Sequence, residues 1–200
     1  PVTRDRVEFP IVESRLLAGD IAYLRLTEFN AVSARRVHSV LRDLLDQNPT
    51  GLVLDLRGNP GGLLDMAVDI ASEFLPKDTL ILTEEQRDRE PKEYRVQRAG
   101  IATTIPLVVL VDGSSASAAE ILAGAIADNH RGILVGERTY GKPSVQSTHK
   151  LSDASGLRVT IAKWCPPRGK DLSDGGIEPD LRVSLSAEDV AAEKDPQLER

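Results

Sequence analysis

Three serines cluster at Ser114, Ser115 and Ser117, between an apolar run at 107–111 and an alanine-rich segment. This pattern predicts a buried strand that leads into the start of a helix. Ser114 or Ser115 fits the helix cap, which is the commonest role of serine at that position. Ser117 has alanine on both sides and is expected in the first turn, where the positive end of a helix favours developing negative charge. Ser117 is therefore a candidate nucleophile, and simple helix capping is the alternative interpretation of the cluster.

A serine nucleophile needs a base that takes its proton. The histidines His38, His130 and His149 lie in segments that indicate surface positions, and the Gly-x-Ser-x-Gly pattern of Ser-His-Asp hydrolases is missing. A lysine can serve when it is neutral, which requires burial or cationic neighbours to lower its pKa from about 10.4. Lys142 stands apart from other charges, and Arg138 is the nearest. It is the candidate base, and an ordinary loop lysine is the alternative.

A glycine-rich loop at 57–62 (Arg-Gly-Asn-Pro-Gly-Gly) follows the apolar run at 52–56. Glycine is tolerated where the chain turns tightly or where its N–H groups must approach a ligand. Free N–H groups ahead of the following helix can hold a negatively charged atom. A plain strand-to-helix turn is the alternative, and the spacing does not match a phosphate-binding P-loop.

Strand and helix patterns alternate along the first two thirds of the chain. Strands are expected at 21–26, 52–56, 80–82, 107–111 and 133–135, and helices at 33–48, 63–74 and 115–128. From residue 144 onward, apolar residues alternate with polar ones, which is typical of antiparallel strands. We therefore predict an α/β fold with a mostly parallel sheet flanked by helices, and antiparallel strands in the C-terminal third. The expected divisions are a lead-in at 1–19, a core domain at 20–185 and a charged helix or tail at 186–200.

The composition suits one soluble domain with an aliphatic core, since 40% of the 200 residues are apolar and 4% aromatic. A net charge of −6 argues against a nucleic acid partner. No apolar run reaches the length of a membrane span, and the single cysteine, Cys165, cannot form an internal disulfide. Because the chain starts at Pro1 and Met66 is its only methionine, we expect that upstream residues have been removed.

Several separated motifs occur in the order found in the C-terminal processing peptidases, or tail-specific proteases, and the sequence resembles that family. They lie at 55–63, 115–121, 136–142, 167–170 and 176–180. The resemblance implies a serine endopeptidase with a Ser–Lys pair on a core of the ClpP and crotonase type. This sequence departs from the family at Ala119, Tyr140 and Pro143, and the family often has glycine where Pro143 stands.

The resemblance also implies a role for each site residue. Ser117 would be the nucleophile, Lys142 the general base and Gln146 a residue that assists the lysine. The backbone N–H groups of Gly62 and Ala118 would form the oxyanion hole. Asp128 would have a structural role.

Further expectations follow from the family alone. They are a reaction that needs neither metal nor cofactor, protein substrates with accessible apolar C-terminal tails, and a possible adaptor protein. The family acts outside the cytoplasm, in the periplasm, cell envelope or thylakoid lumen, and carries a PDZ domain that does not fit within these residues. We expect that this domain preceded residue 1 and has been cut away.

Two other functions stay open on the sequence. A crotonase-like enzyme also uses glycine-rich N–H groups as an oxyanion hole, but it acts on acyl-CoA without a serine nucleophile. A protease relative retained as an inactive binding scaffold would keep the fold without the activity.

Overall fold

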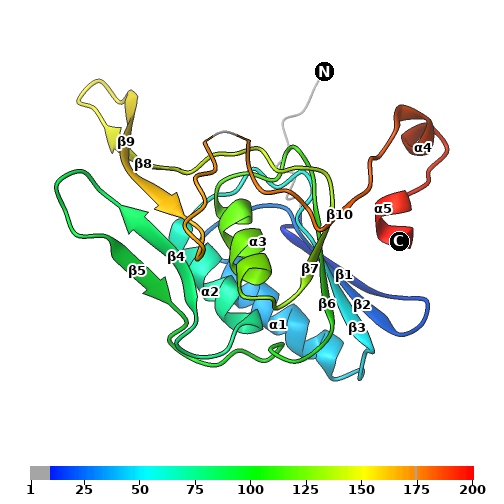
Figure 1. Cartoon of the computed structure of the whole chain (residues 1–200). Helices are drawn as coiled ribbons and strands as arrows, with labels where there is room; N and C mark the ends of the chain where they lie inside the picture. Colours follow the sequence, from blue (N-terminus) through cyan, green and yellow to red (C-terminus); the bar gives the residue numbers. More distant parts are fainter. Residues whose placement is uncertain (1–9, 174) are drawn as a thin grey trace, which may run out of the picture.

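Two β-sheets flank three helices in the part of the chain that the computed structural model describes, residues 10–173 and 175–200 (Figure 1). The larger sheet has six strands. In spatial order they are β1 (Val12–Leu17), β2 (Ile21–Leu26), β3 (Gly51–Asp55), β6 (Leu107–Val111), β7 (Ile133–Gly136) and β10 (Leu181–Arg182). Only β1 and β2 pair antiparallel among these described strands, and the other neighbours are parallel.

The parallel arrangement of β3, β6 and β7 decides where the candidate residues lie. Parallel strands end at the same edge of a sheet, where ligand sites of open α/β sheets form. The glycine-rich loop follows β3, the serine cluster follows β6, and the segment leading to Lys142 follows β7. The three loops therefore emerge next to one another.

The helices α1 (Ser33–Leu45), α2 (Leu64–Phe74) and α3 (Ala118–Asp128) lie on one side of the six-stranded sheet (Figure 1). Apolar residues at helical spacing place Val37, Leu41 and Leu44 of α1 in the core. Helix α3 is buried along most of its length, and its many alanines let it pack closely against neighbouring elements.

The second sheet has four antiparallel strands, in the order β5 (Lys92–Arg95), β4 (Leu80–Glu85), β9 (Gly156–Cys165) and β8 (Ser144–Lys150). Helix α3 contacts both β4 and β7, so it lies between the two sheets. Trp164 of β9 is 1% exposed and joins the main apolar core.

The predicted fold class is confirmed, with a mostly parallel sheet and antiparallel strands from residue 144 onward. The sequence pattern did not show that β4 and β5, from the middle of the chain, complete the antiparallel sheet. Nor did it show that β10, near the C-terminus, extends the parallel one. Both are differences of strand pairing, which depends on tertiary packing rather than on local pattern.

The two chain ends are more involved in the fold than a lead-in and a tail suggest. Residues 1–9 of the expected lead-in lie outside the described residues, but residues 12–17 form β1 at the sheet edge. The C-terminal segment contains α4 (Ala187–Ala191) and α5 (Pro196–Glu199). Figure 1 shows both short helices on the side of the six-stranded sheet opposite α3.

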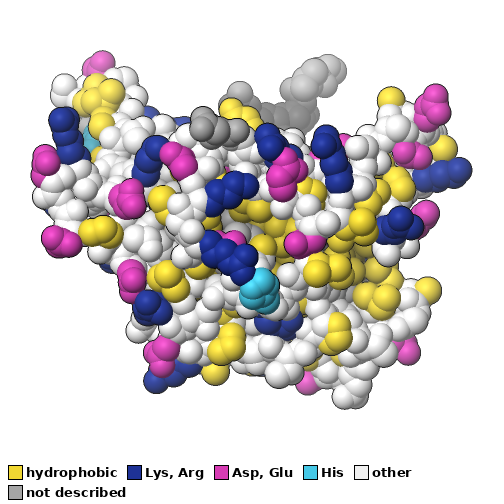
Figure 2. Space-filling view, in the orientation of Figure 1, with side chains coloured by type: hydrophobic (Ala, Val, Ile, Leu, Met, Phe, Trp, Pro, Cys, Tyr) yellow, Lys and Arg dark blue, Asp and Glu magenta, His cyan; other side chains and the backbone are white. Residues whose placement is uncertain are grey.

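The surface carries mixed charge. Figure 2 shows Lys and Arg side chains interspersed with Asp and Glu on the face viewed, with no continuous basic patch on that face. Apolar side chains gather over the strands to the right of α3. None of the described helices is both long and apolar enough to cross a membrane.

Replacing Leu54 by Ala tests the packing of the parallel sheet. Leu54 lies on β3 and is fully buried, so Leu54→Ala should lower the free energy of unfolding by about 2–5 kcal/mol. Leu157→Ala is the matched control, since Leu157 is 49% exposed and its loss should change stability by less than about 1 kcal/mol. Urea unfolding followed by circular dichroism measures both, and equal losses would contradict the described core.

Candidate active site

Backbone hydrogen bonds join three loops: the glycine-rich loop (57–62), the serine loop (112–117) and the lysine loop (137–143). Ala116 N donates to Asn59 O at 3.0 Å, and Tyr140 N donates to Ser115 O at 3.0 Å. The side chain of Ser115 adds a further link, because its Oγ donates to Leu56 O at 2.8 Å. The three loops are therefore held as one unit at the sheet edge.

Ser117 occupies a strained backbone conformation immediately before α3. Its φ is 54° and its ψ is −113°, a region that L-residues rarely adopt. Such strain persists where surrounding structure imposes it, and it is concentrated at functional sites. The expected position of Ser117 in the first helical turn is wrong, since α3 begins at Ala118. Ser115 does not cap α3 either, because its hydroxyl bonds the Leu56 carbonyl instead.

The turn at Gly61 and Gly62 fits closely against its neighbours. Gly62 has a φ of +145°, and a β-carbon there would lie 2.1 Å from Phe29 O. A β-carbon on Gly61 would lie 2.6 Å from Ala116 O and 2.9 Å from Ser117 Cβ. These positions require glycine, because a side chain on Gly62 would clash with Phe29 and one on Gly61 would clash with the residues around Ser117.

Asn59 and Phe29 fix the same turn from two sides. The Asn59 side chain donates to Leu26 O at 2.8 Å and accepts from Gly61 N at 2.8 Å. Phe29 N donates to Gly61 O at 2.9 Å, and Leu63 N donates to Phe29 O at 2.7 Å. Together, these four hydrogen bonds restrict the orientation of the backbone at Gly62.

The backbone N–H groups of Gly62 and Ala118 have no acceptor among the described residues. The turn containing Gly62 packs against the backbone on either side of Ser117, and Ala118 is the next residue in the chain. Ala118 is 1% exposed, and buried backbone donors are rarely unpaired unless water or a ligand satisfies them, whereas Gly62 is exposed. This pair has the composition of an oxyanion hole.

A buried carboxylate holds the serine loop and the lysine loop together. Glu120 is fully buried, and each of its carboxylate oxygens accepts two hydrogen bonds. Oε1 accepts from Thr139 Oγ1 at 2.6 Å and Gly141 N at 2.7 Å. Oε2 accepts from Ser117 N at 2.8 Å and Lys142 N at 2.9 Å. One side chain therefore fixes the backbones of both candidate catalytic residues.

Lys142 is half-buried, and both its backbone N–H and its backbone carbonyl are hydrogen-bonded. Besides the bond from its N–H to Glu120, its carbonyl accepts from Trp164 Nε1 at 3.2 Å. Pro143 O accepts from Trp164 N at 2.9 Å, so the proline fits into this arrangement. Within the described residues, the Lys142 amine makes no hydrogen bond to Ser117. Catalytic hydrogen bonds are often long without substrate and tighten in the complex.

A cavity of about 140 Å³ opens beside Ser117. Its walls carry no charged side chain and come from the glycine-rich loop, the serine loop, helices α2 and α3, and strands β8 and β9. The lining residues are Gly62, Leu63, Leu64, Ser117, Ala118, Ile121, Ser144, Val145, Gln146 and Trp164. The structure thus brings together four of the expected site residues, Ser117, Gly62, Ala118 and Gln146, with Lys142 two residues before the cavity wall.

Gln146 and Asp128 lie in different surroundings. The Gln146 amide lines the cavity but donates to Thr160 Oγ1 at 3.4 Å rather than to Lys142. Asp128 ends α3, about 16 Å from its start at 1.5 Å per residue. It accepts from Arg168 N at 2.9 Å, an anchor for the turn at 166–169. No group of three or more metal-binding side chains occurs within residues 10–173 and 175–200.

Sequence reasoning missed Glu120 as a residue that organises the site. A signal was present, because Ser117 and Glu120 have the Ser-x-x-Glu spacing of a capping box. That pattern predicts the hydrogen bond that Glu120 accepts from Ser117 N, but not those that it accepts from Thr139, Gly141 and Lys142. Those partners are 19 to 22 residues away in sequence, and only the fold brings them to the carboxylate.

Comparisons with known proteins agree with this architecture and give its family. The model of peptidase family S41 matches residues 20–183, and the chain belongs to that family. The resemblance to the C-terminal processing peptidases is thereby confirmed at the level of the family.

The chain is similar to the carboxyl-terminal-processing protease of Synechocystis sp., with 41% identity over 182 residues, 90% of this chain and 42% of that protein. It is also 41% identical to the chloroplastic carboxyl-terminal-processing peptidase 1 of Arabidopsis thaliana, covering 87% of this chain and 35% of the relative. A solved structure titled photosystem II D1 C-terminal processing protease aligns with a TM-score of 0.80 and 33% identity, covering 91% of this chain and 50% of that one. This chain spans less than half the length of these two curated relatives.

Glu120→Gln tests the role of the buried carboxylate. The amide replaces one acceptor oxygen by an NH₂ group that faces two existing donors, so buried donors lose their partners. We expect the free energy of unfolding to fall by about 3–5 kcal/mol. Urea denaturation measures the loss, and Glu90→Gln is the control, because Glu90 is exposed. A loss below about 1 kcal/mol would show that Glu120 does not hold the loops together.

Proposed function

We propose that this chain is the catalytic core of a serine endopeptidase, with Ser117 as the nucleophile. The observation that carries the proposal is the backbone of Ser117, which is strained at the N-terminus of α3 and opens onto an uncharged cavity. The unpaired N–H groups of Gly62 and Ala118 stand beside it. This combination supports acyl transfer, which needs a nucleophile and two donors for a developing oxyanion.

Lys142 acts as the general base in this proposal. As a general base, its amine takes the proton of Ser117 as the hydroxyl oxygen attacks the substrate carbonyl. The oxyanion that forms accepts hydrogen bonds from Gly62 N and Ala118 N, a stabilisation of about 2.7–4 kcal/mol for each donor. Lys142 then gives the proton to the leaving amine, and water hydrolyses the acyl-enzyme at Ser117. Glu120 supports the pair by fixing both backbones, and Gln146 is placed to assist at the cavity wall.

The substrate is a protein cut near or at its C-terminal tail. Two observations support this proposal: the relatives' names describe carboxyl-terminal processing, and the cavity beside Ser117 is uncharged and small. Leu63, Ile121, Val145 and Trp164 provide a wall that suits an aliphatic side chain of the residue before the cleaved bond. An adaptor protein that presents the tail remains part of the proposal.

We propose a site of action outside the cytoplasm, as the family resemblance implies. The narrower expectation of the periplasm is not supported, because the relatives include chloroplastic proteins. The two functions left open by the sequence make different predictions. A crotonase-like enzyme or an inactive scaffold would not form a covalent bond through Ser117.

Ser117→Ala and Lys142→Ala should each reduce hydrolysis of a denatured protein to the background rate while the fold stays intact, because each removes a partner of the proton transfer. A serine-directed phosphonate should label Ser117 in the unchanged chain, as detected by mass spectrometry. Ser114→Ala and Lys150→Ala are matched controls, since both side chains are exposed. Normal turnover by a folded Lys142→Ala variant would exclude the lysine as base, and failure to label Ser117 would favour a scaffold or a crotonase-like enzyme.

The cavity predicts a preference at the residue before the cleaved bond. Peptides with Ala, Val or Leu at this position should be cleaved with kcat/KM at least about 100-fold above the peptide with Asp. An unpaired carboxylate loses several kcal/mol on entering a cavity without charged partners. A matched peptide series followed by mass spectrometry gives the ratios. Comparable rates for Asp and Val would show that this cavity does not receive the side chain.

A further inference from the structure

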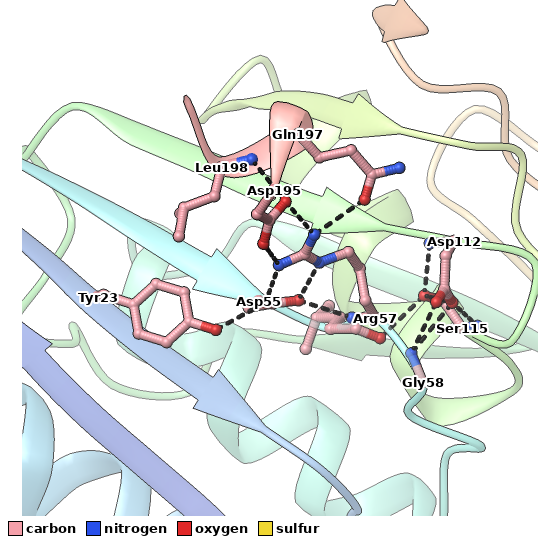
Figure 3. A network of polar contacts seen from close by, with 10 residues as sticks. Tyr23, Asp55, Arg57, Gly58, Asp112, Ser115, Asp195, Gln197 and Leu198 are labelled. Carbon is pink, nitrogen blue, oxygen red and sulfur yellow. Dashed lines mark hydrogen bonds and ion pairs between the residues drawn. The ribbon is translucent and has the colours of Figure 1, made fainter. Parts of the chain in front are cut away.

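The guanidinium of Arg57 has all five of its N–H donors bonded to protein (Figure 3). Asp55 accepts from Nε at 3.0 Å and from Nη2 at 2.6 Å. Asp195 accepts from Nη1 and from Nη2, both at 2.8 Å. Gln197 Oε1 accepts the remaining bond from Nη1 at 2.9 Å. The C-terminal segment thus provides the acceptors for three of the five donors.

The C-terminal segment is folded around this contact. Asp195 caps α5, because its carboxylate accepts from Leu198 N at 3.0 Å while it binds Arg57. Gln197 is 2% exposed, and its amide donates to Val183 O at 2.7 Å. The hydrogen bond from Arg57 holds the pKa of Asp195 below its ordinary value, so the carboxylate is charged at neutral pH. The ion pair is therefore present under working conditions.

On its other side, Arg57 is bound to the end of the central strand. Asp55 is 1% exposed, and it also accepts from Tyr23 Oη at 2.7 Å and Arg57 N at 2.9 Å. Burial, followed by the charge of Asp55, raises the pKa of Tyr23 to about 12, so the phenol remains a donor. Burial alone would lower the pKa of Arg57, but its bonds to Asp55 and Asp195 raise it above the ordinary value.

Arg57 is also the first residue of the loop that ends at Gly62. The next residue, Gly58, donates its N–H to the Asp112 carboxylate at 3.0 Å, and Asp112 accepts from Ser114 N and Ser115 N in the serine loop. A displacement of Arg57 would therefore act on both loops that supply the unpaired donors. A cleft of about 530 Å³ adjoins this network, and Asp195 and Gln197 form part of its wall.

We propose that the segment 195–198 is a latch that positions the oxyanion hole through Arg57. The inference rests on the proposed function, since it assigns Asp195 a positioning role in that reaction. Without Asp195, two donors of Arg57 lose their acceptor and bond to water, Gln197 alone holds the guanidinium from the C-terminal side, and Arg57 gains freedom to move about Asp55. The loop from Arg57 to Gly62 then samples positions in which the Gly62 N–H no longer faces the oxyanion.

The test compares Asp195→Ala, Asp195→Glu and Glu199→Ala in the 200-residue chain. Glu199→Ala is the matched control, because it removes the same charge from an exposed position on α5. Asp195→Ala should lower kcat about tenfold on a peptide with an apolar residue before the cleaved bond, with KM changed by less than about twofold, as expected for lost transition-state stabilisation. Asp195→Glu, which keeps a carboxylate, should recover at least half of the loss on a logarithmic scale, and Glu199→Ala should match the unchanged chain.

Amide hydrogen exchange gives a second readout that does not depend on activity. Asp195→Ala should speed exchange at Asn59 and Gly61, whose N–H groups are bonded within the loop, by at least about threefold. If the chain cleaves peptides but Asp195→Ala leaves kcat and exchange unchanged, the latch is overturned and the proposed function stands. If the unchanged chain neither cleaves nor labels at Ser117, the proposed function fails, and the exchange result alone decides whether Asp195 holds the loop.

Discussion

The site depends on one buried carboxylate and the four donors that point at it. Removing a charge from water is strongly unfavourable unless hydrogen bonds replace its hydration. Glu120 meets this condition with two bonds on each oxygen, three of them from backbone N–H groups. The donors come from the serine loop and the lysine loop. If either loop moved away, the buried carboxylate would lose hydrogen bonds that replace its hydration. The stability of the folded chain and the relative positions of Ser117 and Lys142 therefore have the same physical origin.

The strain at Ser117 follows from the same constraint. A φ of 54° at a residue with a side chain is unfavourable by about 1–3 kcal/mol, and it persists only when the surroundings impose it. Glu120 holds the N–H of Ser117 from the helix side, while Gly61 packs against its β-carbon from the neighbouring loop. In this conformation Ser117 forms part of the cavity wall.

The sequence predicts elements better than it predicts contacts between them. Apolar runs located the central strands, and helical spacing located α1, because both patterns reflect local burial. Alternation at Leu157, Val159 and Ile161 correctly predicted a strand, yet all three side chains are at least 39% exposed, since alternation does not say whether a partner covers the apolar face. The partners of Glu120, and the bond between Arg57 and Asp195 across 138 residues, could not be read from spacing, because they depend on strand order. The start of α3 was missed because a strained turn has no distinct sequence signature, and small residues fit both a helix and such a turn.

Buried and half-buried carboxylates accept hydrogen bonds from several of the backbone N–H groups in the loops around Ser117. A tight loop turns several N–H groups inward, and each needs an acceptor. Asp55 accepts from Arg57 N, Asp112 accepts from the N–H groups of Gly58, Ser114 and Ser115, and Glu120 accepts from Ser117, Gly141 and Lys142. These bonds leave the N–H groups of Gly62 and Ala118, beside Ser117, without an acceptor among the described residues. In the proposed reaction, an oxyanion bound there would accept hydrogen bonds from these two donors, and its stabilisation would require little reorganisation of the loops.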